Sequence, residues 1–145
     1  MRCVIQRVQD ATVTVDGALI GSISQGILVY FGVQKGDTEE QMRWICDKMV
    51  KLRMFRDAND KMNLSLDDVH GQILLVSQFT LCANLHKGNR PSYDDAEDPE
   101  KANQMYSKAL SYLTGLGYTV AHGRFGAHMM VTYTNDGPVT FVLER

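Results

Sequence analysis

The apolar run Ile27–Phe31, which has a glycine on each side, constrains the fold more than any other segment. Successive side chains of a strand point to opposite faces, so a run without polar side chains needs cover on both faces. A second and shorter run, Ile73–Val76, has the same character. Strands of this kind lie inside a sheet, and the sequence therefore predicts a central sheet with other elements packed against it.

Alternation of apolar and polar side chains near the N-terminus indicates further strands. Segments 4–8 and 11–15 alternate in this way, and Asp16-Gly17 followed by segment 18–23 is the pattern of a tight hairpin. Three more extended segments close the chain, at 118–121, 129–134 and 139–143. We therefore expect mostly antiparallel pairing.

Two amphipathic helices are predicted between the strands. Thr38 and Gln41 form a capping-box pattern at the start of the first helix, and Pro99 suits the first turn of the second. Gly117 is placed to end the second helix. The apolar stripes contain Met42, Ile45, Met49 and Leu52 in the first helix, and Ala102, Met105, Tyr106, Ala109, Leu110, Leu113 and Leu116 in the second. The predicted fold class is α+β, with mostly antiparallel sheets and two main helices packed on one face of a single domain, residues 1–145.

Charge and composition exclude several functional classes. The net charge of −2 argues against binding long nucleic acid through many phosphates, although recognition of an RNA end stays open. No apolar run approaches ~18 residues and no leader pattern opens the chain, so we expect a cytoplasmic protein without a membrane segment. Cys3, Cys46 and Cys82 have no metal-site spacing, and no phosphate-binding loop is present. We expect reduced thiols, no metal and no cofactor.

Polar groups follow directly on the apolar run Ile73–Val76. Ser77, Gln78, Phe79 and Thr80 place hydroxyls, an amide and backbone N–H groups at one edge of the sheet, where open sheets tend to bind ligands. We predict that a small polar ligand binds there. A long polar loop follows, at 84–98, and its basic cluster 86–90 either contacts a phosphate or is an ordinary solvated surface.

The segment Asn135–Thr140 combines turn residues with an X-Pro bond between Gly137 and Pro138. X-Pro bonds are the only ones for which the cis form is energetically accessible. A cis bond would orient two successive carbonyl oxygens in a way that no ordinary turn reproduces. The alternative is a trans turn that links two antiparallel strands, and base rates alone favour it.

The motifs taken together resemble the D-aminoacyl-tRNA deacylase family over essentially the whole chain. They are Ser77–Thr80, Gly88-x-Arg90-Pro91-Ser92, Gly123–Met129 and Asn135–Thr140, in this order and spacing, after an opening strand that contains Arg7. Tyr93 follows the second motif where phenylalanine is common in the family. The resemblance implies layers of the deacylase type, β/β/α, and a homodimer that acts on the 3′ end of aminoacyl-tRNA.

The implied reaction is hydrolysis of the ester that joins a D-amino acid, or glycine, to tRNA, as chiral proofreading in translation. By resemblance, Gly137 and Pro138 form a cis pair that enters the partner subunit's pocket and selects against L-residues. Rigid backbone suits this task, because a steric wall at the α-carbon excludes the L-enantiomer. The side chain of the accepted D-residue can then point to solvent without being recognised. Glycine has no Cβ and would escape that exclusion.

Several residue roles follow from the resemblance, each with an alternative. Arg7 would donate to a carbonyl of the Gly-Pro segment, or else form a surface salt bridge. Phe125 and Met129 would contact the terminal adenosine, or else only pack in the core. Backbone N–H groups of Phe79 and Thr80, with the Gln78 amide, would stabilise an oxyanion while the terminal ribose 2′-hydroxyl assists.

Two rival functions stay open at the level of the sequence. One is a module that binds RNA ends, or a dimeric scaffold, without catalysis. The other is a general esterase in which Thr80 or Cys82 is the nucleophile, although no histidine stands in a recognisable triad pattern.

Overall fold

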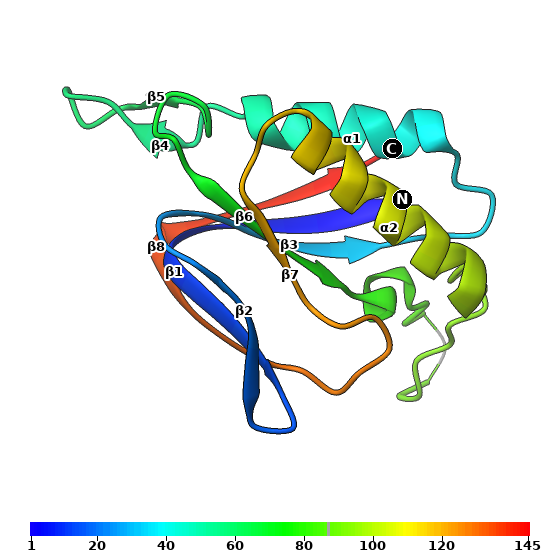
Figure 1. Cartoon of the computed structure of the whole chain (residues 1–145). Coiled ribbons are helices and arrows are strands. Elements are labelled where there is room, and N and C mark those ends of the chain that lie inside the picture. The colour runs from blue at the N-terminus through cyan, green and yellow to red at the C-terminus, as the bar shows by residue number, and fades with distance from the viewer. Residues whose placement is uncertain (87) are drawn as a thin grey trace.

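The computed structural model describes residues 1–86 and 88–145. Its main elements are seen in Figure 1. The strands are β1 (Arg2–Val15), β2 (Ala18–Ile23), β3 (Gly26–Gly32), β4 (Phe55–Arg56), β5 (Met62–Leu64), β6 (Gln72–Ser77), β7 (Val120–His122) and β8 (Met130–Glu144). The helices are α1 (Glu39–Lys51) and α2 (Pro99–Gly115), with one turn of 3-10 helix, η1 (Phe79–Cys82).

A mixed sheet of six strands forms the centre of the molecule, in the order β2-β1-β3-β6-β7 with β8 on β1. The predicted apolar runs are β3 and β6, which lie side by side in the interior of the sheet. Strand β1 is antiparallel to β2, β3 and β8, whereas β3–β6 and β6–β7 are parallel pairs. Most pairings are thus antiparallel, as predicted, and each parallel pair is joined by a crossover that contains one of the two helices.

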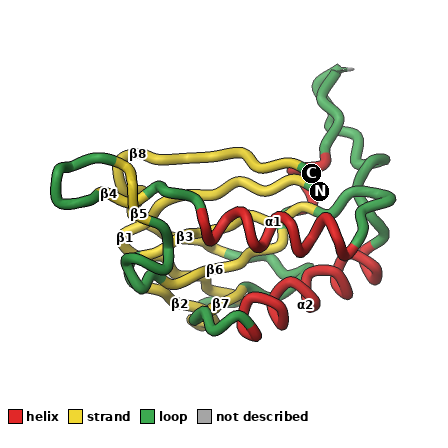
Figure 2. Tube along the Cα trace, turned by 90° about the horizontal axis from the view of Figure 1, so that it is seen from above, coloured by secondary structure: helices red, strands yellow, loops and turns green. Residues whose placement is uncertain are grey.

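Both helices pack on the same face of the sheet, as Figure 2 shows from above. The core beneath them takes its side chains from α1, α2 and the helix-facing positions of β1, β3 and β6. Ile27, Val29 and Phe31 represent β3 there, and all are at most 1% exposed. The predicted arrangement of two helices on one face is confirmed.

The other face of β3 is covered by the sheet itself. A second core contains Leu28 of β3 and Leu74 and Val76 of β6, together with residues of β1 and β2. The sheet curls until β2 approaches β7, and a Cβ added at Gly21 would lie 2.8 Å from the His122 carbonyl oxygen. The result is a mixed, nearly barrel-shaped sheet, which explains how β3 and β6 can be apolar on both faces.

Two strand predictions were wrong in their boundaries. Segments 4–8 and 11–15 belong to one continuous strand, β1, whose pairing with β8 is irregular around Val8. Segments 129–134 and 139–143 likewise belong to one strand, β8, so the Asn135–Thr140 segment does not reverse the chain. Turn residues indicate the end of a strand in many proteins, whereas β1 and β8 accommodate them as bulges in one long ladder.

The predicted helix ends are confirmed. Thr38 and Gln41 exchange the two hydrogen bonds of a capping box at the start of α1. Asp98 accepts from the Glu100 N–H before α2, and Pro99 occupies its first turn. At the C-terminus of α2, Gly117 has φ +95° and donates to Thr114, while Tyr118 donates to Leu113, which is a Schellman motif.

Among residues 1–86 and 88–145, no helix combines the length and apolar character that a membrane crossing requires.

Candidate active site

A cavity of about 760 Å³ opens where β3 and β6 end. Its walls come from the ends of those strands, the start of α2, the loop before α2 and the segment that leads into β8. Ser77, Gln78, Phe79, Phe125 and Met129 all line it. Five of the predicted site residues, from two distant segments, are therefore brought together around one cavity of the size that small ligands occupy.

The polar edge of this cavity is built by the transition from β6 to η1. Gln78 donates its backbone N–H to the Phe31 carbonyl at 2.8 Å, which extends the β3–β6 pairing by one residue. Its side-chain amide donates to the Thr80 hydroxyl. Since η1 begins at Phe79, its first N–H groups have no earlier carbonyl within the helix to bond. Thr80 is exposed and lies beside the cavity rather than on its wall.

The apolar side of the cavity is fixed by a shared acceptor, the carbonyl oxygen of Leu75 in β6. The buried Tyr106 donates its hydroxyl to this oxygen at 2.7 Å, and Gly123 donates its N–H at 3.1 Å. The Tyr106 ring lies 6.0 Å from the Phe125 ring, centroid to centroid. Burial raises the pKa of Tyr106 far above its usual range, so the phenol stays a donor.

Phe125 and Met129 pack in the core and also line the cavity, whereas their contact with the terminal adenosine stays a prediction. Phe125 is half-buried and packs against the main core, and Met129 packs against the second core. Both also line the cavity. The Met129 sulfur lies 2.5 Å from where a Cβ of Gly123 would be, so a side chain at 123 would displace it. The same two side chains thus contribute both to core packing and to the wall of the cavity.

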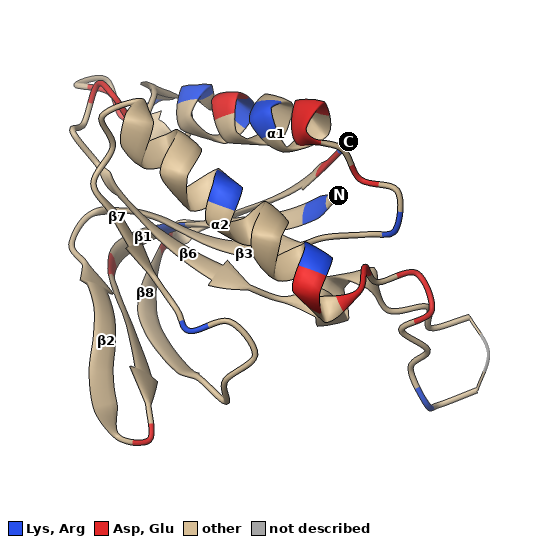
Figure 3. Cartoon of the chain, turned by 45° about the vertical axis from the view of Figure 1, so that its right-hand side comes forward, with Lys and Arg blue, Asp and Glu red and all other residues tan. Residues whose placement is uncertain are grey.

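The entrance of the cavity combines aromatic and acidic groups. Phe79 and Tyr93 are 58% and 40% exposed, and their rings meet edge to face with centroids 4.9 Å apart. Glu97 and Asp98 form part of the wall, with Lys35 as a cationic neighbour. Figure 3 shows acidic residues along the segment that leads into α2. Of the predicted basic cluster 86–90, Lys87 lies outside the described residues.

Gly137 and Pro138 lie elsewhere, on a bulge of β8. Gln6 pairs with Thr140 and Val8 with Asn135, so four residues of β8 oppose only Arg7 of β1. The Asn135 amide spans this bulge, donating to the Arg7 carbonyl at 2.9 Å and to the Val139 carbonyl at 3.3 Å. The Gly137–Pro138 peptide bond is cis, and both residues are exposed.

The buried side chain of Arg7 stabilises this bulge. Its side chain is 1% exposed, and its Nε lies 3.0 Å from the Asp136 carboxylate and donates to the Asp136 carbonyl oxygen at 3.2 Å. Its Nη1 donates to the carbonyl oxygen of Met54. The two descriptions considered from the sequence, a hydrogen bond to the Gly-Pro segment and a surface salt bridge, are each right in part. The pair is not at the surface, since the guanidinium is buried.

The bulge and the cavity are separate within one chain. Arg7 pairs with Ile27, whereas the cavity begins at Phe31, four residues further along β3. That separation is roughly 13 Å along the strands, and the two strand spacings from β8 to β3 add ~10 Å across the sheet. Neither Gly137 nor Pro138 lines the cavity of its own chain.

The cysteines are poor nucleophiles in this setting. All three are buried, and Cys82 donates its thiol to the Val33 carbonyl at 3.4 Å. Burial raises the pKa of the Cys82 thiol above its ordinary value, so the reactive thiolate is disfavoured at neutral pH. No group of three or more His, Cys, Asp or Glu side chains that could hold a metal ion occurs among the described residues.

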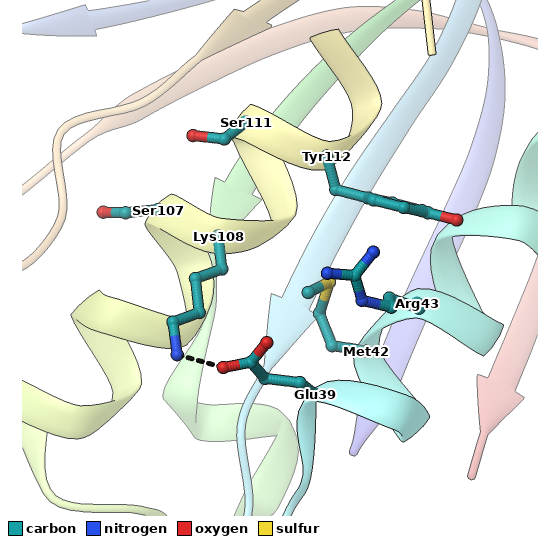
Figure 4. Close-up of a pocket in the computed structure, with 7 residues that line it drawn as sticks. All are labelled: Glu39, Met42, Arg43, Ser107, Lys108, Ser111 and Tyr112. Atoms are coloured by element: carbon teal, nitrogen blue, oxygen red, sulfur yellow. Dashed lines mark hydrogen bonds and ion pairs between the residues drawn. The ribbon is translucent and has the colours of Figure 1, made fainter. Parts of the chain in front are cut away.

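A second, shallower cavity of about 430 Å³ lies between α1 and α2 (Figure 4). Its charged side chains already have partners within the cavity wall. Lys108 contacts Glu39, whose pKa it lowers, and the Arg43 guanidinium lies 4.9 Å above the Tyr112 ring. These interactions link the two helices, and we assign no ligand to this cavity.

Three contributors to the sites were missed in the sequence. Tyr106 was assigned only to the apolar stripe of α2, although a tyrosine hydroxyl in such a stripe signals a buried acceptor. The acidic wall at Glu97 and Asp98 resembles ordinary surface charge in the sequence. Asn135 was noted as a turn residue, and nothing in the sequence indicated that its amide spans a bulge.

The fold is that of a single-domain α+β protein, and its candidate ligand cavity lies at the end of a mixed, nearly barrel-shaped sheet. The model of the D-Tyr-tRNA(Tyr) deacylase family matches residues 4–144. The chain belongs to this family.

Curated relatives match along the entire chain. A D-aminoacyl-tRNA deacylase of Pelobacter propionicus is 51% identical over 145 residues, which cover 100% of both chains. The enzymes of the same name from Geotalea uraniireducens and Dictyoglomus turgidum are 51% and 50% identical. Each match covers 99% of this chain and at least 92% of the relative.

Solved structures share the fold. A protein described as c-Myc DNA Unwinding Element Binding Protein has a TM-score of 0.94 at 40% identity, covering 100% of this chain and 99% of that one. A probable eukaryotic D-amino acid tRNA deacylase has a TM-score of 0.81 at 17% identity, covering 98% of this chain and 97% of that one. The second likeness supports the fold alone.

Proposed function

We propose that the protein hydrolyses the ester bond between a D-amino acid and the 3′ end of tRNA, and that it does so in the cytosol as a homodimer. The family to which the chain belongs is the support for the reaction itself. The finer part of the proposal concerns the site: Gly137 and Pro138 of one protomer complete the cavity of its partner and exclude L-residues there. Glycine mischarged on tRNA would be accepted, because it has no Cβ to exclude.

The observation that carries the finer part is the contrast between the two halves of the candidate site. The cavity at Ser77–Phe79 has the polar groups proposed to bind the oxyanion, and neither Gly137 nor Pro138 of the same chain lines it. The bulge at Gly137-Pro138 is exposed and is braced by hydrogen bonds from Arg7 and Asn135. A second copy of the chain could supply each with what it lacks.

The support of the bulge suits a steric selector. Arg7 fixes the carbonyl of Asp136 from below, and Asn135 fixes the carbonyl of Val139. The intervening residues therefore have little freedom to withdraw from a substrate. A selector that works by exclusion needs this stiffness, because a wall that yields by about 1 Å no longer rejects the wrong hand.

The chemistry at the cavity requires donors for the developing oxyanion and a nucleophile. In our proposal the N–H groups of Phe79 and Thr80, at the start of η1, are the donors, with the Gln78 amide nearby. A water molecule attacks the ester carbonyl carbon with assistance from the 2′-hydroxyl of the terminal ribose, and the bond from that carbon to the ribose ester oxygen breaks, releasing the D-amino acid and the tRNA. The protein contributes position and dipoles. Phe125 and Met129 contact the terminal adenosine on the apolar side.

Stereospecific release of the amino acid is the result that tests the proposal. Purified protein with an added chelator should release D-tyrosine from D-tyrosyl-tRNA about 100-fold faster than L-tyrosine from the L-ester, which corresponds to ~2.7 kcal/mol of exclusion. The measurement is the fraction of acylated tRNA that remains with time. Equal turnover of the two esters would contradict chiral selection, and binding of uncharged tRNA without cleavage would favour the RNA-end-binding alternative.

The general-esterase alternative makes a different prediction about side chains. If the backbone N–H groups are the oxyanion donors, the kcat of Thr80→Ala and of Cys82→Ala should each fall by no more than about 10-fold. This loss is well short of the one that follows removal of an oxyanion donor. Because the Cys82 pKa is raised, iodoacetamide should also leave the activity unchanged at pH 7.5. Loss of all turnover in either variant, with the fold intact by circular dichroism, would instead identify a side-chain nucleophile.

A further inference from the structure

Two exposed aromatic rings mark the entrance of the cavity. Among the Phe and Tyr side chains on its wall, Phe79 and Tyr93 are the most exposed, and they come from different parts of the chain, η1 and the loop before α2. Their edge-to-face contact, with centroids 4.9 Å apart and planes at 61°, makes one continuous aromatic surface. We call this surface, formed by Phe79 and Tyr93, the aromatic entrance.

The aromatic entrance is held in place by backbone bonds. Asn84 and Ser92 exchange two hydrogen bonds, of 2.8 and 3.1 Å, which close the loop just before Tyr93. The Tyr93 carbonyl accepts a hydrogen bond from the Ala96 N–H at 3.0 Å, and the Ser92 hydroxyl donates one to the Asp94 carboxylate at 2.7 Å. The ring of Tyr93 is therefore presented by an ordered turn and needs little rearrangement to accept a ligand.

The charge around the entrance favours a neutral, flat partner there. Glu97 and Asp98 outnumber the one Lys or Arg of the same wall, Lys35, so the wall offers no net positive charge that would hold a phosphate on the rings themselves. A nucleobase carries no charge and offers a π-face that stacks on aromatic side chains. Arg90, which is exposed on the loop three residues before Tyr93, is the cation nearest in sequence for a backbone phosphate outside the cavity.

We infer that the aromatic entrance is a stacking site for the cytosine base that precedes the terminal adenosine of the bound tRNA. The inference rests on the proposed function, in which the terminal adenosine and its ester occupy the cavity. The 3′ end of tRNA is single-stranded, so its bases are free to splay apart and stack on protein rings. With the last nucleoside inside, the preceding base is at the entrance, where the rings of Phe79 and Tyr93 are exposed.

Two substrates, one with and one without the preceding nucleotides, separate the entrance from the cavity. We would measure kcat/KM on D-tyrosyl-tRNA and on the D-tyrosyl ester of adenosine, which lacks every preceding nucleotide. Tyr93→Ala should lower kcat/KM on the tRNA about 10-fold, the loss expected for ~1.4 kcal/mol of stacking. Its kcat/KM on the adenosine ester should equal that of the parent protein.

Two further variants are matched controls. Tyr93→Phe keeps the ring and should behave as the parent on both substrates. The Leu85 side chain belongs to the same loop, is 69% exposed and does not line the cavity. Leu85→Ala should therefore change kcat/KM on neither substrate. A thermal unfolding curve of each variant verifies that the loop change leaves the core intact.

The outcomes are distinct. An equal loss on both substrates would mean that Tyr93 shapes the cavity or contacts the amino-acid side chain, and would overturn the inference. No loss on either substrate, or a loss in Tyr93→Phe as large as in Tyr93→Ala, would overturn it as well. If the parent protein cleaved neither ester, the proposed function would be wrong, and this inference would be wrong with it.

Discussion

Replacing Gly137 with alanine is expected to lower kcat/KM on D-aminoacyl-tRNA by about 10- to 100-fold. Gly137 has φ +123°, a conformation that L-residues rarely adopt, and strain of this kind costs ~1–3 kcal/mol. The added Cβ would also lie 2.7 Å from a Val139 methyl and 2.9 Å from Arg7 Nη2. The bulge must therefore shift away from Arg7, and the wall proposed to face the substrate shifts with it. Single-turnover deacylation with both the D- and L-esters is the measurement.

A matched control separates backbone strain from the effect on the site. Gly17, at the tip of the β1–β2 hairpin, also has positive φ, at +79°, but a Cβ added there would have no neighbouring atom within 4 Å. Gly17→Ala should therefore lose stability through backbone strain alone and retain its activity. If the two variants lost activity equally, the effect at Gly137 would be one of stability only, and the bulge would have no part in the site.

Replacing Phe79 with proline is expected to lower kcat by about 10²–10³-fold, which is the usual loss for removing one oxyanion donor. Proline lacks the N–H that we propose as a donor, and a first helical position is where proline is tolerated. Gln78, which would precede the proline, already lies outside the α region that a following proline disfavours, with φ −146° and ψ 82°. The kcat on D-tyrosyl-tRNA at saturating substrate is the quantity to compare.

Phe79→Ala is the control for this change, because it removes the same ring and keeps the N–H. It should retain far more of the parent kcat than Phe79→Pro does. If the two variants were equally slow, the ring rather than the backbone donor would be the important group. Backbone donation at this position would then be excluded.

The same two variants test the cross-subunit arrangement. A chain with Gly137→Ala and a chain with Phe79→Pro are each defective, but their mixed dimer would contain one site with an intact bulge and an intact edge. Random mixing should then recover about a quarter of the parent activity. Separate sites within each chain would give no recovery, and a monomer in solution would exclude the arrangement directly.

Local signals in the sequence were reliable where the physics is local. The capping box at Thr38 and Gln41, Pro99 in a first turn and Gly117 after α2 are each fixed by hydrogen bonds within a few residues. The apolar runs of β3 and β6 were recognised because only a strand covered on both faces tolerates them. What covers the second face, the curled sheet itself, has no local signature.

The environment of Arg7 shows the opposite case. An arginine in an alternating strand looks like a surface residue, and its sequence neighbours do not reveal that Met54 and Asp136 accept its hydrogen bonds. Those partners are 47 and 129 residues away in sequence. Burial of such a charge is possible only when several acceptors converge on it, which is a property of the assembled fold.

The sequence by itself determined the fold class, the helix ends and the two buried strands, because periodicity and capping are written in the order of residues. The residues of both halves of the candidate site were predicted from the resemblance of motifs. The tertiary structure alone decided that β1 and β8 each run as one strand, that Ser77–Phe79 meets Phe125 and Met129 around one cavity, and that Gly137 and Pro138 stand apart from it. These features involve residues that are far apart in the sequence. They depend on the register of strands far apart in the chain, and register is set by packing across the whole sheet.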